Sequence, residues 1–214
     1  VTFTGGGASD FEFFLNGVSQ GPSSATTTFT TSTLANGDIV GVTGSLLGCT
    51  NSPASLTFTV FNFPVVSLVN NAEIQICTGE LTDLTASGAT NYQFLVNGVP
   101  TGPSSAATTL NTALINGNVV TVIGELNGCP TTSTDSYTFT VFDFPALTST
   151  SSDADNIICL DELISFTGSG AMTYDFALNG TVLQSGAGST FDISTLLDGD
   201  IISITGLNGD CPSV

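Results

Sequence analysis

The chain contains no lysine, no arginine and no histidine among its 214 residues, against 18 aspartate and glutamate residues. A typical protein is about a quarter charged, with both signs present, so this absence is not a sampling effect. Without basic side chains the chain cannot neutralise phosphates, which excludes nucleic-acid binding and attraction to anionic lipid headgroups. It can form no side-chain salt bridge, so burial, backbone hydrogen bonds and covalent links must hold the fold.

The same absence argues against an enzyme. Serine and threonine abound, but no histidine or lysine is present to activate a nucleophile. Carboxylate pairs at Asp161-Glu162 and at Asp198/Asp200 could in principle act as acid and base. Acids this close in sequence are usually part of a solvated loop, so we predict no catalytic and no cofactor-binding residue.

The apolar segments are too short and too interrupted to cross a membrane. The longest, TFTVFNFPVVSLV at 57–69, is broken by threonine, asparagine, serine and proline. Hydrophobic residues still make up 41% of the chain, so a core can form despite the net charge of −18. We therefore expect a folded chain with no membrane insertion in this segment.

Internal repeats organise the sequence. LNGVSQGPSS at 15–24 returns as VNGVPTGPSS at 96–105, and a diverged copy, LNGTVLQSG, occupies 178–186. The cysteine that closes each copy lies at 49, 129 and 211, in steps of 80 and 82 residues. The repeat unit is therefore about 81 residues long, which is typical of a tandem array.

Each unit has the pattern of an all-β domain. Short β-branched and aromatic segments alternate with turns, and in YTFTVF at 137–142 the side chains of Tyr137, Phe139 and Val141 are in phase. Asn-Gly or Asp-Gly pairs, which favour tight hairpins, follow the segments at 97–98, 116–117, 179–180 and 198–199. About seven short strands in ~80 residues predict antiparallel immunoglobulin-like β-sandwiches.

The predicted boundaries give three repeats. Residues 1–64 form an incomplete repeat that lacks its first strand and cysteine, 65–145 form a complete repeat, and 146–214 form a repeat that lacks its last strand. The joints at 61–64 (FNFP) and 142–145 (FDFP) contain a proline between aromatic residues and no flexible linker. We expect a stiff connection and hence a rod.

Five cysteines are present, without metal-binding spacing. Cys77 and Cys129 are 52 residues apart, and so are Cys159 and Cys211. Equal spacing within each repeat predicts the disulfides Cys77–Cys129 and Cys159–Cys211. Each would stabilise its repeat by roughly 4 kcal/mol, because it closes a loop in the unfolded chain. Cys49 occupies the second position of a pair, so its partner is expected outside the chain and the chain is expected to be a window cut from a longer array.

Calcium is the metal ion that the sequence motivates best. Asp153-Ala154-Asp155-Asn156 follows a joint and lies near Asp143 in the sequence, which suits a hard cation. The first joint has Asn62 in place of Asp143, and the second repeat has NNAE at 70–73 where the third has DADN. Because this ligand set changes between copies, the sequence favours solvated acidic loops, and we predict no metal-binding residue.

Several motifs resemble a known family. They are ICTGEL at 76–81, Y-x-F-x-x-N-G at 92–98, L-x-N-G-x-x-V-x-V-x-G at 114–124 and the closing Gly-Cys at 128–129. Together they resemble the immunoglobulin/PKD-like repeats of very large surface adhesins of Bacteroidota, including gliding-motility adhesins exported by the type IX secretion system. In the third repeat Asp161 replaces Gly79, a departure that we expect to cost little.

The resemblance implies an extracellular filament at the cell surface, with a structural and adhesive role and a contribution to gliding. The partners would be neighbouring repeats and surface polysaccharide or other cell-surface components. Two alternatives remain open: a pilus or sheath subunit completed by strand donation, and a carbohydrate-binding module of an exported enzyme. Three tyrosines and no tryptophan argue against the second alternative, since it needs an exposed aromatic platform.

Overall fold

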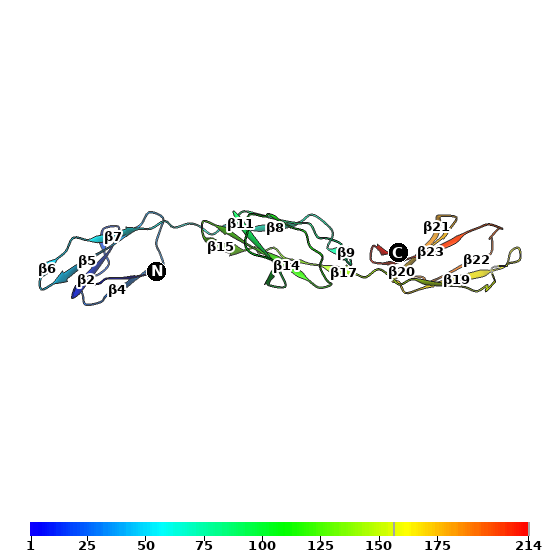
Figure 1. Ribbon diagram of the computed structural model, residues 1–214, viewed down its shortest axis with the longest axis horizontal. Coiled ribbons are helices and arrows are strands. Elements are labelled where there is room, and N and C mark those ends of the chain that lie inside the picture. Colours follow the sequence, from blue (N-terminus) through cyan, green and yellow to red (C-terminus); the bar gives the residue numbers. More distant parts are fainter. Residues whose placement is uncertain (156, 214) are drawn as a thin grey trace. The chain divides into compact units, whose positions relative to one another are not determined.

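The computed structural model describes residues 1–155 and 157–213 (Figure 1). Every regular element in those ranges is a β-strand, as predicted. No helix long and apolar enough to cross a membrane occurs in the part described. The chain divides into two compact units, Val1–Phe63 and Pro64–Val214, and the second unit holds both the second and the third repeat.

The first unit contains two antiparallel sheets. One pairs β1 with β4, and the other has the order β3-β2-β5-β6 with β7 also pairing with β5. Phe11 and Phe13 of β2 and Val40 of β5 are buried. The strands are β1 (Thr2–Thr4), β2 (Asp10–Leu15), β3 (Val18–Ser19), β4 (Thr28–Thr30), β5 (Ile39–Leu46), β6 (Cys49–Thr50) and β7 (Ala54–Thr57).

The second repeat is an immunoglobulin-like sandwich. One sheet has the order β13-β10-β8, the other has the order β12-β11-β14-β15 with β16 pairing with β14, and β17 pairs with β9 in parallel. The strands are β8 (Ser67–Asn70), β9 (Gln75–Cys77), β10 (Leu84–Ser87), β11 (Asn91–Val96), β12 (Val99–Pro100), β13 (Thr109–Leu110), β14 (Val119–Leu126), β15 (Cys129–Thr132), β16 (Tyr137–Thr138) and β17 (Thr140–Phe142).

The core of this repeat lies between the two sheets. Leu68 and Leu84 from one sheet meet Phe94, Val120 and Val122 from the other. The predicted in-phase residues of 137–142 also face this core: Phe139 is fully buried, and Tyr137 and Val141 pack against it. Alternation along a strand places every second side chain inward, so this part of the sequence prediction is confirmed.

The third repeat is built in the same way. One sheet has the order β18-β19-β22 and the other β21-β20-β23-β24, with Phe176 fully buried between them. Its strands pair only with one another, as those of the second repeat do. They are β18 (Thr148–Ser151), β19 (Ile164–Ser169), β20 (Thr173–Leu178), β21 (Thr181–Gly186), β22 (Thr190–Ile193), β23 (Ile202–Asn208) and β24 (Cys211–Pro212).

The Asn-Gly and Asp-Gly pairs form two kinds of turn. At 97–98 and 179–180 both residues have positive φ and close the predicted hairpins, β11–β12 and β20–β21. At 116–117 and 198–199 only the glycine has positive φ, and the strands on either side do not pair with each other. The hairpin prediction is therefore wrong at these two sites, where an i to i+3 turn leads into the next strand.

The asparagine of each repeated LNG or VNG motif also crosslinks two turns. Its side-chain oxygen accepts a backbone N–H at the start of the long strand opposite. Asn16 accepts from Ile39 and Asn97 from Val119, both at 2.8 Å, and these donors are the first residues of β5 and β14. Asn179 accepts at 3.0 Å from Ile201, which directly precedes β23. The repeated motif thus stabilises the sandwich.

Candidate functional site: an inter-repeat junction

The cysteines are paired differently from the sequence prediction. Cys77 of the second repeat forms a disulfide with Cys211 of the third, across 134 residues of sequence. Cys49, Cys129 and Cys159 carry free thiols. The predicted pairings Cys77–Cys129 and Cys159–Cys211 are therefore not the ones that form, although Cys77 and Cys211 are both disulfide-bonded.

The physical reason in the second repeat is the length of β14. Cys129 lies opposite Leu126 at the last residue of that strand. Cys77 lies on β9, which pairs with β17. β17 follows Thr138, and Thr138 pairs with Val119, the first residue of β14. Cys77 therefore lies beyond the opposite end of β14. Eight residues of strand extend for about 23 Å, whereas a disulfide needs Cα atoms within about 7 Å. The labels β9 and β15 accordingly lie at opposite ends of this sandwich (Figure 1).

The third repeat separates its cysteines in the same way. Cys211 pairs with Asn208 at the last residue of β23. Cys159 lines a groove with Ile202, the first residue of the same strand. The second and third repeats therefore each carry one cysteine at each end.

On the side of the second repeat, the junction is held by the end of its last strand. Phe142 pairs with Cys77, and the Thr78 backbone N–H donates to the Phe142 carbonyl oxygen at 2.9 Å. The Thr78 hydroxyl donates to the Asp143 carboxylate at 2.6 Å. These bonds fix the Phe-Asp segment beside the disulfide.

On the side of the third repeat, a hairpin turn contacts that segment. The Asn208 side-chain amide donates to the Asp143 carbonyl oxygen at 3.0 Å. Gly209 lies so close to Phe142 that a Cβ atom there would be 2.7 Å from the ring. Of the two aromatic residues expected to pack at this joint, Phe142 does so, whereas Phe144 remains 42% exposed.

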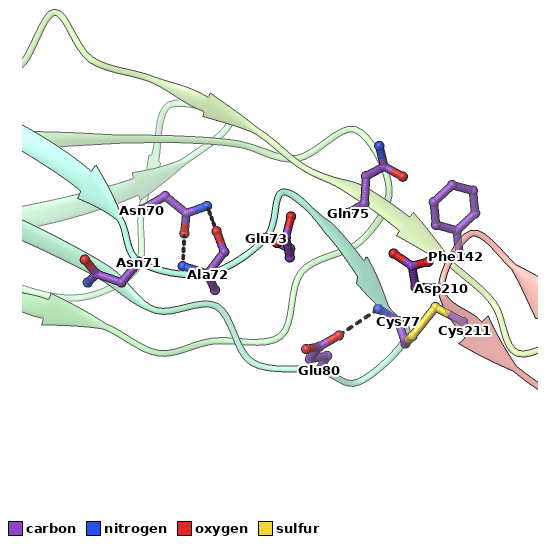
Figure 2. Close-up of a pocket in the computed structure, with 10 residues that line it drawn as sticks. All are labelled: Asn70, Asn71, Ala72, Glu73, Gln75, Cys77, Glu80, Phe142, Asp210 and Cys211. Carbon is purple, nitrogen blue, oxygen red and sulfur yellow. Dashed lines mark hydrogen bonds between the residues drawn. A yellow bond between two sulfur atoms is a disulfide. The ribbon is translucent and has the colours of Figure 1, made fainter.

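A groove of about 660 Å³ opens beside the disulfide (Figure 2). Glu80 uses one carboxylate oxygen to accept the Cys77 backbone N–H at 3.0 Å, so it serves the turn that carries the cysteine. The described residues contain no group of three or more acidic or cysteine side chains placed to hold a metal ion. The lining residues are Asn70, Asn71, Ala72, Glu73, Gln75, Cys77, Glu80, Phe142, Asp210 and Cys211.

The calcium candidates are separated in the structure. Asp143 belongs to the junction, whereas Asp153 lines the groove of Cys159 at the other end of the third repeat. Asp153 accepts the Asp155 backbone N–H at 3.1 Å, as expected of a turn. Asn156 lies outside the described residues.

The paired carboxylates also have structural partners. Glu162 accepts the Cys159 backbone N–H at 2.8 Å. Asp200 accepts the Asn179 amide at 2.8 Å and the Leu197 backbone N–H at 2.9 Å, and these two hydrogen bonds hold its pKa below the usual value. Glu162 and Asp200 therefore accept hydrogen bonds from the backbone of their own turns.

Comparisons with known proteins find matches among solved structures. No family model matches the chain. No curated protein matches it either. Among solved structures, fibronectin(III)-like modules of CbhA from Clostridium thermocellum align with a TM-score of 0.49 at 12% identity, covering 69% of this chain and 90% of theirs. Beta-glucuronidase 3 from Bacteroides uniformis aligns with a TM-score of 0.31 at 14% identity, over 69% of this chain and 23% of that enzyme.

Proposed function

We propose that this chain is a segment of a long extracellular filament, in which disulfide-bonded immunoglobulin-like repeats serve a structural and adhesive role at the cell surface. The observation that carries the proposal is the Cys77–Cys211 disulfide, which joins one repeat to the next. A bond in that place does little for either core, but it resists separation of the two domains under load. Disulfides persist in oxidising, extracellular compartments, which agrees with this location.

The composition supports the same proposal. A chain with 18 acidic and no basic side chains repels its own copies, which keeps long filaments apart. It also presents no site for proteases that cut after lysine or arginine. The adhesive partner is surface polysaccharide or another cell-surface component, and by the resemblance stated above the filament contributes to gliding.

Strand donation is the second candidate, and the third repeat has a groove that accommodates a further strand. In the second repeat β17 covers β9, and Ile76 of β9 is buried. The equivalent segment of the third repeat, around Cys159, lies in no strand and lines a groove of about 750 Å³. A strand with the alternation of residues 137–142 fits such a groove, supplied by the same chain or by another.

Labelling of intact cells tests the proposal. Antibodies against the folded chain should label intact, unpermeabilised source cells, and removal of the gene should reduce their attachment to surfaces. An antibody against a cytoplasmic protein of the same cells should label only permeabilised cells. Labelling that appears only after permeabilisation would rule out the extracellular filament.

A further inference from the structure

The three free thiols occupy places that the repeat makes equivalent to the two bonded ones. Cys77 and Cys159 are the first cysteines of the second and third repeats. Cys49, Cys129 and Cys211 are the closing cysteines of the first, second and third. Only one first cysteine and one closing cysteine are joined, and these belong to successive repeats.

The turn that follows the first cysteine has the same hydrogen bonds in both copies. The backbone N–H of Cys77 donates to Glu80 at 3.0 Å, and that of Cys159 donates to Glu162 at 2.8 Å. In return the Glu80 N–H donates to the Cys77 carbonyl oxygen at 3.0 Å, and the Glu162 N–H to that of Cys159 at 3.1 Å. The turn that presents the bonded Cys77 therefore presents the free Cys159 in the same way.

The closing cysteine has the same strand pairing in all three copies. Cys49 pairs with Leu46, Cys129 with Leu126, and Cys211 with Asn208, each at the end of the long central strand and after a two-residue turn. The bonded closing cysteine is buried, whereas the two closing cysteines without a disulfide partner are more exposed. Cys211 is 1% exposed, whereas Cys129 is half-buried and Cys49 is exposed.

Exposed apolar side chains lie beside two of the free cysteines, Cys49 and Cys159. Leu47, at the turn position equivalent to Gly209, has positive φ and is 95% exposed. Gly209 packs on Phe142 of the preceding repeat. Around Cys159, Ile157, Leu160 and Leu197 are each at least 67% exposed. The exposed Leu47 beside Cys49 indicates a surface that another repeat covers, and the apolar groove around Cys159 is open to a further strand or repeat.

We propose a disulfide ladder in which the first cysteine of each repeat bonds to the closing cysteine of the repeat that follows it. Under this rule Cys159 bonds to the closing cysteine of a following repeat. Cys49 and Cys129 bond to the first cysteines of the repeats that precede their own. The proposal needs the tandem-array part of the proposed function and none of its adhesive part.

The chemistry is thiol–disulfide exchange. A thiolate of one repeat attacks the disulfide of an exported thiol oxidoreductase, or of glutathione disulfide in the test tube. The resulting mixed disulfide is attacked by the thiolate of the neighbouring repeat. The two cysteines lose two protons and two electrons, and the donor disulfide is reduced to two thiols.

A duplication within the full chain tests the rule with the chain's own sequence. Residues 65–145 are inserted a second time directly after residue 145, which adds one further copy each of Cys77 and Cys129. The chain is folded in a glutathione redox buffer, free thiols are alkylated, and their number is counted by intact mass. The ladder predicts three free thiols: Cys49, the first-copy Cys129 and Cys159. Pairing within repeats predicts only one, Cys49.

Serine variants of each copy of Cys129 locate the new bond. Changing the first-copy Cys129 to serine should lower the count of free thiols from three to two, because that residue is already unpaired. Changing the second-copy Cys129 should raise it to four, because the first-copy Cys77 loses its partner. The reverse pattern, or a count of one in the parent, would overturn the ladder.

Peptide mapping of the native protein gives a reading that does not depend on folding of the duplicated chain. Under non-reducing conditions, peptides containing Cys129 or Cys159 should be linked to peptides from adjacent repeats. A Cys129 that is alkylated quantitatively in the native protein, or one linked to Cys77, would contradict the proposal. Either result would leave the surface location, tested separately by labelling of intact cells, unaffected.

Discussion

Cys77 and Cys211 join two sandwiches whose strands do not pair with each other, so the covalent bond between them belongs to the junction and to neither core. It accompanies the Asn208–Asp143 hydrogen bond and the contact of Gly209 with Phe142. Together they make the second and third repeats one compact unit.

Removal of this disulfide should uncouple the two repeats. The double variant Cys77→Ser, Cys211→Ser releases a loop of 134 residues, whose closure restricts the unfolded chain by roughly 5 kcal/mol. We expect urea unfolding of the second and third repeats to shift to lower denaturant and to separate into two transitions. Circular dichroism during urea titration measures this.

In the 214-residue chain Cys129→Ser is the matched control, because Cys129 has no disulfide partner within that chain. Its free energy of unfolding should lie within about 0.5 kcal/mol of the parent value, as expected of a small change away from the core. If the double variant and this control unfold at the same urea concentration, the disulfide contributes nothing to the junction.

The cysteine pairing shows where sequence spacing stops being informative. A spacing of 52 residues recurs in both repeats, but any pairing rule applied to equal repeats also recurs at a fixed spacing. The choice between a bond within a repeat and a bond between repeats depends on which end of the sandwich each cysteine occupies. That follows from strand pairing, which residue counting does not supply.

The strand at 137–142 makes the same point on a smaller scale. Alternation correctly predicts that Phe139 is buried. It does not predict that the chain changes partners there, from β14 before Phe139 to β9 after it. The parallel pairing with β9 is a long-range contact, and it is what brings Phe142 beside Cys77.

Gly88 should tolerate no side chain. It has a φ of +94°, and a Cβ atom there would lie 1.9 Å from the Val65 carbonyl oxygen. Gly88→Ala should therefore lower the free energy of unfolding of the second repeat by about 3 kcal/mol or more, because backbone must move as well as adopt a disfavoured conformation. Hydrogen exchange resolved by repeat measures the loss.

The equivalent Gly7 offers an internal control in the 214-residue chain, where the first repeat has no counterpart of Val65. Its φ is +84°, but a Cβ atom there would have nothing within 4 Å. Gly7→Ala should lower the free energy of unfolding of the first unit by only about 1–2 kcal/mol, the cost of placing alanine in a left-handed backbone conformation. Equal losses at the two glycines would show that the contact with Val65 is not restrictive.

Asp161 should be a weak point in the third repeat. It adopts a φ of 62° at the position where the second repeat has Gly79, with a φ of 87°. This left-handed conformation is higher in energy for non-glycine residues than for glycine, although the difference is smaller for aspartate than for most. Asp161→Gly should therefore stabilise the third repeat by about 0.5–1 kcal/mol, and Gly79→Asp should destabilise the second by a similar amount, both measured by thermal unfolding. A destabilised Asp161→Gly would mean that the aspartate side chain contributes more than its backbone costs.

Asp38 and Asp200 should make the first and third repeats more acid-sensitive than the second. The Asn16 amide and the Ala35 backbone N–H lower the pKa of Asp38, and the Asn179 amide and the Leu197 N–H lower that of Asp200. A carboxyl group whose pKa is lower in the folded state than in the unfolded state stabilises the folded state at pH values above its unfolded-state pKa of about 3.9. That contribution is lost as the pH falls through the folded pKa.

The second repeat has Asn118 at the equivalent turn, where its side-chain oxygen accepts the Ile115 N–H at 3.0 Å without titrating. Asp200→Asn should therefore make the third repeat less stable near pH 7, and the difference from the parent should shrink below about pH 4. Asn118→Asp should introduce the same pH dependence into the second repeat. Urea midpoints measured from pH 7 to pH 2 report both changes as differences from the parent, which cancels the titration of the other carboxyl groups. A constant difference between parent and Asp200→Asn over that range would show that the carboxylate charge plays no part in this turn.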